Sequence, residues 1–379
     1  MQILMLLTNA FDPDPRVYQE AKALVEKGYK VSILCWDRDL KAPLQENIDG
    51  IHVERIYVRS THGRGSTQII FLLLFWIKAL IKALSKKIDI TYCHDFDTLP
   101  LGYTISRLKK TKLAYDAHES YIDMLANNVS PIIKKIISVM ENYLLKKVDL
   151  TITVGDILKE SLIKKGAFQV IVVGNWKQLS DFQFPAKVLE EEKTKLGIPK
   201  DALVVSYIAH LNPERKIEPL LNAIKNKENV FLIIGGKGPL EVMVKDAAKR
   251  YKNIIFLGFI HPSKVPFYVA LSDVVYYGFD KNNPNAQYSA PNKLFEALAA
   301  GKAIITGDFG EIGRIVKKYK CGLILKDYSI EEIKEALNIL KNKNYLIEIQ
   351  NNSLKIAEKK YNWQMAEENL IKGINRLLN

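Results

Sequence analysis

The sequence has few cysteines, no apolar run long enough to span a bilayer, and no dinucleotide-binding glycine pattern. Its cysteines, Cys35, Cys93 and Cys321, lie far apart without metal-ligand spacing, and each is in or beside an apolar stretch. We therefore expect reduced, buried thiols. The apolar run at residues 69–77 falls short of the ~20 residues of a membrane-spanning helix. The opening apolar stretch, residues 3–7, is too short for a signal peptide, which predicts a cytoplasmic protein.

Acidic side chains are fewer than basic ones, at 42 against 55, so the net charge is +13. Such an excess predicts an acidic partner: a nucleic acid, an anionic lipid or a phosphorylated small molecule. No helix-turn-helix, zinc or RNA-recognition signature is present, which argues against nucleic acid. The lysines gather in two apolar segments, at Lys78, Lys82, Lys86 and Lys87, and at Lys134, Lys135, Lys146 and Lys147.

The segment at residues 69–87 has two interpretations. With Trp76 and its lysines it is typical of a helix lying in a membrane interface, which would give a peripheral contact with an anionic membrane. The alternative is a core helix of an α/β domain with its charges in water. Both remain open from the sequence.

The length of 379 residues predicts two domains, because single cores stop growing at roughly 250 to 300 residues. Short β-forming runs alternate with helical stretches, which predicts parallel sheets built from βαβ units. We expect strands at residues 3–8, 30–35, 51–57, 88–93, 112–116, 150–154 and 170–173, then at 203–208, 230–234, 254–257, 274–277, 303–306 and 322–325. A linker is expected at 174–185, with only helices after residue 325.

Polar and glycine residues follow these strands, where ligands bind in parallel sheets. They include residues 9–16, 94–95, 118–119, 212–216 and 235–239. Glycines after a strand commonly serve only to make a turn, so the loop at 235–239 carries little weight alone.

A single glutamate, Glu296, stands in an otherwise apolar helix that opens on Pro291 and closes on Gly301. Asn292 and Lys293 lie four and three residues before it, so all three could flank one ligand near the positive end of the helix. A ligand with several hydroxyls and with phosphates would fit these three side chains. The simpler interpretation is a surface ion pair between Lys293 and Glu296.

In order and spacing, these motifs resemble the retaining nucleotide-sugar glycosyltransferases of family 4, whose GT-B fold has two Rossmann-like domains facing across a cleft. The resemblance covers nearly the whole chain. It is carried by Asp14-Pro15-Arg16-Val17, Asp116-Ala117-His118-Glu119, Arg215-Lys216-Ile217-Glu218, Gly236-Lys237-Gly238-Pro239, Leu257-Gly258-Phe259, the Glu296 helix and Tyr361-Asn362-Trp363.

The resemblance implies an N-terminal acceptor-side domain at 1–178, a donor domain at 179–360, and a C-terminal helix at 361–379 that returns to the first domain. It implies transfer of a hexose-type sugar from a nucleoside diphosphate, such as a UDP-sugar, to a glycan or lipid-linked acceptor with retention, as in polysaccharide biosynthesis. No cofactor or metal is expected, because no Asp-x-Asp pair follows a strand where a metal would bridge the donor phosphates.

Each site residue has an expected role. Arg215, helped by Lys216, would stabilise the leaving diphosphate, Glu296 would accept both ribose hydroxyls, and His118 would contact the donor sugar, with a buried structural histidine as the alternative. The donor site would comprise Glu296, Asn292, Lys293, Leu294, Gly236, Phe259 and Ile260. The acceptor or phosphate side would comprise Asn9, Asp14, Arg16 and Glu119, although Asp14 is favoured as a helix cap and Glu119 as a partner that orients His118.

The chain departs from the family pattern at three places. Tyr288 stands where a glutamate is common eight residues before Glu296, Ala209-His210 replaces a glycine-arginine pair, and either Arg215 or Lys216 could be the phosphate-binding cation. Two other functions therefore stay open, a nucleotide-sugar epimerase and a non-catalytic nucleotide-sugar-binding protein.

Overall fold

The computed structural model describes the chain except for residues 13, 61–67, 126–128, 281 and 379. It consists of two compact α/β units. Unit 1 comprises Met1–Gly174 with Ala366–Asn379, and unit 2 comprises Asn175–Met365. The division after Gly174 falls at the start of the predicted linker.

Unit 1 is built on an eight-stranded sheet with the order β3-β4-β2-β1-β5-β6-β7-β8. All pairs are parallel except β3 with β4. The strands are β1 (Gln2–Leu7), β2 (Lys30–Asp37), β3 (Gln45–Ile48), β4 (Ile51–Tyr57), β5 (Ile90–His94), β6 (Lys112–Ala117), β7 (Leu150–Thr153) and β8 (Val170–Val172). The central strands are continuous runs of buried apolar residues, as expected for a sheet covered on both faces.

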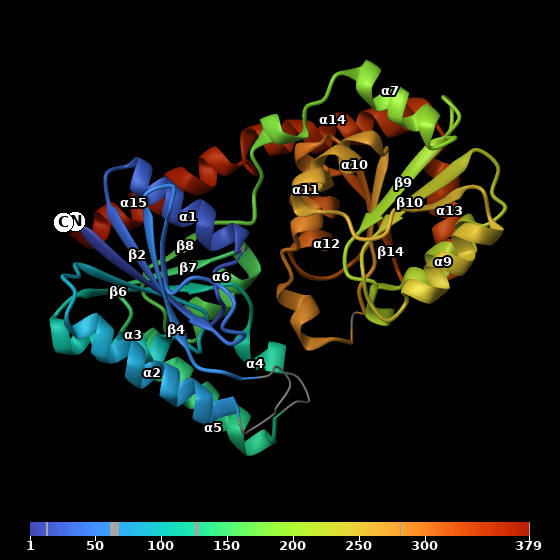
Figure 1. Cartoon of the computed structure of the whole chain (residues 1–379). Coiled ribbons are helices and arrows are strands. Elements are labelled where there is room, and N and C mark those ends of the chain that lie inside the picture. The colour runs from blue at the N-terminus through green and yellow to red at the C-terminus, as the bar shows by residue number, and fades with distance from the viewer. Residues whose placement is uncertain (13, 61–67, 126–128, 281, 379) are drawn as a thin grey trace. The chain divides into compact units, whose positions relative to one another are not determined.

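Helices cover both faces of this sheet (Figure 1). They are α1 (Pro15–Glu26), α2 (Gln68–Leu84), α3 (Leu99–Lys109), α4 (Tyr121–Leu125), α5 (Pro131–Leu145), α6 (Asp156–Lys164) and most of α15 (Trp363–Leu378). α2, α3 and α5 lie together on one side of the sheet, and α1 and α15 lie on the other. Crossover connections between parallel strands are right-handed, so chain segments that leave β1 in opposite directions place their helices on opposite faces. The Asn369 amide of α15 donates to the Val172 carbonyl at 3.1 Å, so the last helix belongs to unit 1.

Unit 2 has a six-stranded parallel sheet with the order β11-β10-β9-β12-β13-β14. Its strands are β9 (Leu203–Ile208), β10 (Val230–Gly235), β11 (Ile254–Phe256), β12 (Val274–Tyr277), β13 (Ala303–Gly307) and β14 (Gly322–Leu325). Its helices are α7 (Ala186–Lys195), α8 (Ile217–Ile224), α9 (Glu241–Arg250), α10 (Val265–Leu271), α11 (Asn292–Ala299), α12 (Gly310–Tyr319), α13 (Ile330–Leu340) and α14 (Lys343–Lys359), with short 3-10 turns η2 (Leu179–Phe182), η3 (Pro213–Arg215), η4 (Pro262–Lys264) and η5 (Pro284–Tyr288).

The predicted strands are all present, with ends that differ by two residues or fewer. The two-domain α/β architecture predicted from the sequence is therefore confirmed, as are the three buried free cysteines. The antiparallel strand β3 was not predicted. Its sequence is Gln-Glu-Asn-Ile at the edge of the sheet, where half-exposed polar residues give no apolar period to detect.

Candidate functional site

The strand order of unit 1 changes direction between β1 and β5, and ligands of open α/β sheets bind at such a switch point. Thr8 follows β1, and Asp95 and Asp97 follow β5. The Thr8 hydroxyl donates to the Asp97 carboxylate at 2.5 Å, which joins the two loops. Burial beside Asp95 raises the pKa of Asp97 to about 7.

A buried ion cluster lies beside this switch point, at the end of β6. Asp116 is fully buried and accepts hydrogen bonds from the Arg16 guanidinium at 2.9 Å and 2.8 Å. Arg16 also lies 3.1 Å from the buried Glu20 of α1 and donates to the Val173 carbonyl at 2.7 Å. Burial opposes ionisation of Asp116, but Arg16 and His118 outweigh it and hold the pKa of this carboxyl well below its usual value.

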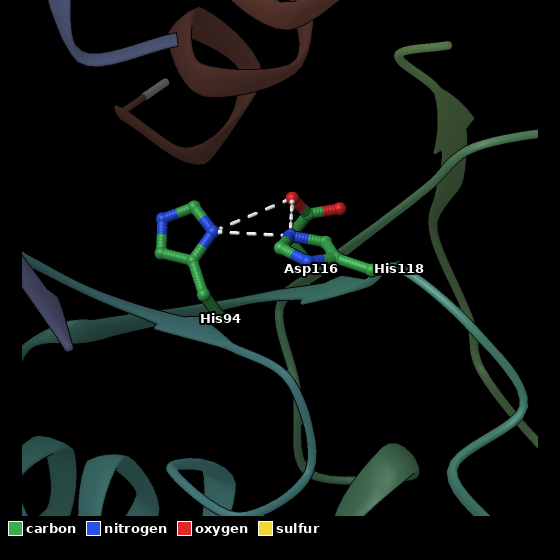
Figure 2. Close-up of side chains that lie close together, drawn as sticks. All are labelled: His94, Asp116 and His118. Carbon is green, nitrogen blue, oxygen red and sulfur yellow. Dashed lines mark hydrogen bonds and ion pairs between the residues drawn. The ribbon is translucent and has the colours of Figure 1, made fainter. Parts of the chain in front are cut away.

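His118 lies between two carboxylates in this cluster. Its Nε2 is 2.8 Å from Asp116 and its Nδ1 is 3.2 Å from Asp95. Figure 2 shows His94 facing both residues, with its Nδ1 3.4 Å from the same carboxylate oxygen and 3.4 Å from Nε2 of His118. Burial disfavours the imidazolium, yet Asp95 and Asp116 raise the pKa of His118 well above its ordinary value. The two carboxylates thus favour the protonated ring, and the side chain of His118 keeps 20% of its surface exposed.

His94, Asp116 and His118 also offer ligand atoms that lie close enough together for a metal ion. The surroundings fit a metal poorly, because both Asp116 oxygens already accept hydrogen bonds from Arg16, whose positive charge would repel a dication. The raised pKa of His118 also favours a proton on the nitrogen that a metal would need. The three residues are better explained as an ion cluster.

The other predicted residues of unit 1 are placed as follows. Asp14 caps α1, accepting a hydrogen bond from the Val17 amide at 3.2 Å, so the capping role favoured from the sequence is present. The exposed Asn9 amide donates to Asp14 at 2.8 Å. Glu119 is exposed and follows His118 directly.

Unit 2 has its own switch point, between β9 and β12. Arg215, from the loop after β9, donates to the Tyr277 hydroxyl at 2.5 Å and stacks on Phe279, with its guanidinium carbon 4.4 Å from the ring centroid. Lys216 lies in the same loop, and its ammonium donates to the Asp280 carboxylate at 2.9 Å. Side chains at the end of β12 and just beyond it thus hold both predicted cations. They lie where β9 and β12 diverge, which is the place where an anionic ligand is expected.

The loop after β10 approaches β9 closely. Gly236 has φ of 146°, and a Cβ there would lie 1.9 Å from the Ala209 carbonyl oxygen, so only glycine fits. After β11, Phe259 exposes 59% of its surface and lies under the Lys237 ammonium, which is 4.8 Å from the ring centroid. Ile260 is buried.

α11 carries the remaining donor-side residues. Glu296 is 8% exposed, and its carboxylate lies 2.5 Å from the Lys293 ammonium. The ion pair of the simpler interpretation is therefore present, but it is largely buried and does not lie on the surface. Asn292 accepts a hydrogen bond from Lys177 at 2.6 Å. Leu294 is fully buried and its amide donates to the Pro291 carbonyl, so it anchors the helix in the core of unit 2.

Aromatic side chains position α11 from its buried face. Phe295 of α11 lies 5.8 Å from Tyr361 and 6.5 Å from Trp176, measured between ring centroids. Asn362 closes α14 through hydrogen bonds to the Ala357 and Glu358 carbonyls. The Tyr361-Asn362 motif thus supports the helix that carries Glu296.

Sequence reasoning missed most of the ion cluster of unit 1. Glu20, His94, Asp97 and Asp116 were not assigned roles, although the last three lie at or beyond strand ends. An Asp-x-Asp pair, Asp95 and Asp97, does follow β5, but its carboxylates already bond His118 and Thr8. The sequence did contain one signal of this cluster. Glu20 stands four residues after Arg16 on the buried face of a helix, a spacing that predicts an ion pair between them.

Known proteins match the chain over both units. The family model "Glycosyltransferase Family 4" matches residues 16–176, and "Glycosyl transferases group 1" matches residues 188–362. The alpha-monoglucosyldiacylglycerol synthase of Acholeplasma laidlawii is 26% identical over 77% of this chain and 76% of its own. The chitobiosyldiphosphodolichol beta-mannosyltransferase of Debaryomyces hansenii is 24% identical over 92% and 83%.

Solved structures agree in fold. Sucrose-phosphate synthase from Thermosynechococcus elongatus superposes with a TM-score of 0.80 at 16% identity, covering 100% of this chain and 99% of that chain. Anabaena HepE in complex with UDP superposes with a TM-score of 0.75 at 15% identity, covering 99% and 100%. The resemblance inferred from the motifs is thus confirmed, and the chain belongs to the family 4 glycosyltransferases with the GT-B fold.

Proposed function

We propose that this glycosyltransferase moves a hexose-type sugar from a nucleoside diphosphate to a glycan or lipid-linked acceptor, with retention of anomeric configuration and without a metal. The observation that carries the proposal is the pair of charged groups in unit 2. Arg215 is held on Tyr277 and Phe279 after the diverging strands, and the nearly buried Glu296 stands on the helix that follows β12.

The chemistry of these groups suits a sugar diphosphate. The leaving diphosphate gains negative charge as the glycosidic bond breaks, and a preorganised guanidinium can bind two of its oxygens. α11 begins without a side-chain cap, so the positive end of the helix would add to this stabilisation. An ionised Glu296 would accept both ribose hydroxyls, and Phe259 offers an exposed ring beside the glycine loop.

On unit 1, the proposed role of His118 is to donate a hydrogen bond to a hydroxyl of the donor sugar. Asp116, 2.8 Å from Nε2, fixes the orientation of the ring. The sugar hydroxyl would take the place of Asp95 at Nδ1, where the contact is longer, at 3.2 Å. In a retaining transfer the departing phosphate oxygen can accept the proton of the acceptor hydroxyl, so no separate protein base is required. Asn9 and Glu119 are exposed on the same unit and are proposed to lie toward the acceptor.

The comparisons support a nucleotide-sugar donor and a lipid-linked acceptor. HepE has been solved with UDP and with UDP-glucose, and the names of two relatives contain the lipids diacylglycerol and dolichol. The second of these names is that of a mannosyltransferase, which favours transfer over epimerisation. The two names carry opposite prefixes, alpha and beta, so the anomeric outcome for this chain is a direct target for experiment.

One experiment tests the proposal as a whole. The protein is titrated by calorimetry with UDP, GDP and their glucose and mannose derivatives, and release of the diphosphate is then followed with and without a glycosyl lipid acceptor. We expect acceptor-dependent release that persists in EDTA and a product whose anomeric proton coupling matches that of the donor.

Binding without release under any acceptor would favour a nucleotide-sugar-binding protein, the alternative raised by Tyr288. Loss of release in EDTA, or an inverted anomer, would refute the corresponding part of the proposal.

A further inference from the structure

α2 is attached to unit 1 by a narrow strip of its surface. The buried positions are Phe75, Ala79 and Ala83, four residues apart, and the Trp76 indole donates to the Asp97 carbonyl at 2.9 Å. Many of the other large apolar residues of the helix face outward, and Ile81 reaches 65% exposure. The exposed apolar side chains are Ile69, Ile70, Leu73, Leu74, Ile77, Ile81 and Leu84.

α5 repeats this arrangement on the same side of the sheet. Its exposed apolar residues are Ile132, Ile136, Val139 and Tyr143, at helical spacings of four, three and four. α3 contacts both helices and exposes Leu108. We name the exposed apolar side chains of α2 and α5, with Leu108, the α2–α5 face (Figure 1). An amphipathic helix normally turns such a stripe toward the core, so two outward stripes on neighbouring helices indicate an interaction surface.

The exposed charges on the described parts of α2, α3 and α5 are all basic. The sequences of α2 and α3 contain no acidic residue, and the single carboxylate of α5, Glu141, is buried and bonded to Lys165 at 2.7 Å. Basic side chains are exposed along the three helices and just beyond α5, at Lys78, Arg107, Lys135, Lys146 and Lys147. Apolar residues with surrounding lysines are the pattern of a surface that enters the headgroup region of an anionic bilayer.

We propose that the α2–α5 face docks unit 1 onto an anionic lipid bilayer. Contact is peripheral, because no helix among the described residues is long and apolar enough to cross a bilayer. A second copy of the chain suits the face less well, since a two-fold contact would bring the same lysines together with no carboxylate to pair with them. The inference agrees with a lipid-linked acceptor but does not rest on it, because vesicle binding can be measured without donor or acceptor.

The charge part of the proposal is tested by co-sedimentation with vesicles of neutral phosphatidylcholine, alone or with phosphatidylglycerol. The full chain should bind the mixed vesicles more tightly, and the preference should fall as salt screens the charges. Lys135→Gln, Lys146→Gln and Lys147→Gln together should weaken binding on the order of 100-fold, at about fivefold per lysine. The matched control exchanges three exposed lysines of unit 2, Lys249, Lys355 and Lys359, and should bind like wild type.

The apolar part is tested with Ile77→Ser combined with Ile136→Ser. Both side chains are exposed, so folding should be unchanged, while vesicle affinity should fall roughly tenfold or more as inserted methylenes are lost. Val242→Ser with Ile347→Ser, two exposed apolar residues of unit 2, is the control. Equal binding to both vesicles, or unaltered binding of both the lysine and isoleucine variants, would overturn the proposal.

Sedimentation velocity tests the remaining alternative, in which two copies of the chain join through the α2–α5 face. A wild-type dimer that Ile77→Ser with Ile136→Ser converts to a monomer would show that the face joins two copies, which also overturns the proposal. Calorimetric donor binding by the same variants should remain at the wild-type level. A wild-type protein that binds vesicles but no nucleotide sugar would therefore count against the transfer reaction and leave the docking surface standing.

Discussion

Replacing Glu296 by glutamine should weaken nucleotide binding much more than it destabilises the protein. Glutamine keeps the shape of the side chain but loses its charge and one of its two acceptor oxygens. If the carboxylate accepts both ribose hydroxyls, glutamine keeps one acceptor and loses one charged hydrogen bond, worth about 1.5 to 3 kcal/mol. Nucleoside diphosphate affinity should therefore fall by about ten- to 150-fold.

The structure also sets the cost to stability. Glu296 and Lys293 expose only 11% and 14% of their side chains, so the variant leaves a largely buried ammonium without its partner. We expect a lower midpoint of thermal unfolding, yet binding measured well below that midpoint reports on the folded protein alone. The two effects are thus separable in one set of samples.

Isothermal titration with UDP and GDP measures the affinity, and thermal unfolding measures the stability. The control is Glu192→Gln, which breaks the pair between Glu192 and Lys195, also three residues apart, on α7, the helix that precedes β9. It should leave affinity unchanged. A Glu296→Gln protein with a lower unfolding midpoint and wild-type affinity would show that this carboxylate serves only its pair with Lys293, and would refute the ribose contact.

Three further outcomes follow from the geometry. Arg215→Met should lower kcat by about 10²- to 10³-fold in a diphosphate-release assay, because the ring stack on Phe279 can be kept while the positive charge is lost; an unchanged kcat would exclude Arg215 as the phosphate cation. Arg16→Met should destabilise the protein by about 3 to 5 kcal/mol in urea unfolding, because Asp116 and Glu20 would be left buried side by side; a change below 1 kcal/mol would contradict the ion cluster. The pKa of His118 is raised on folding, so its contribution to stability is complete below about pH 6.5 and fades as pH rises through the folded value. His118→Gln should therefore cost more stability at pH 6 than at pH 9, and an equal cost at both would show that the ring is neutral in the native protein.

The parallel sheets could be predicted because their strands are short, continuous apolar runs. Residues 51–57, 203–208, 274–277 and 322–325 were predicted with the ends that the structure has. Strands buried on both faces leave this strong local signal. β3 leaves none, because its pairing depends on the neighbouring β4 and its residues are half solvated.

Side-chain partners far apart in the sequence were harder to predict than strands. Arg16 and Asp116 lie 100 residues apart, and only the parallel pairing of distant strands brings them within 2.8 Å. Motif spacing identified Arg16 and His118 as candidates. It gave no indication that one carboxylate, that of Asp116, binds both. For α2, composition indicated an amphipathic helix and left its orientation open, because the direction of an apolar stripe depends on what covers it. Here the small residues Ala79 and Ala83 face the core.

Backbone strain points to the loop that holds Arg215. Lys216 adopts φ of 52° and ψ of 42°, a left-handed conformation that costs a non-glycine residue about 1 to 2 kcal/mol. Two interactions hold it there: the Tyr276 hydroxyl donates to the Lys216 carbonyl at 3.0 Å, and the Lys216 ammonium bonds Asp280 at 2.9 Å. Both partners come from β12 or the loop after it, across the switch point from β9. The same conformation ends α3 at Lys110 and α12 at Lys320, so what distinguishes Lys216 is that its partners come from across the switch point. Because the turn also ends η3 directly after Arg215, it fixes the backbone that carries the guanidinium where β9 and β12 diverge, which is the place proposed for the diphosphate.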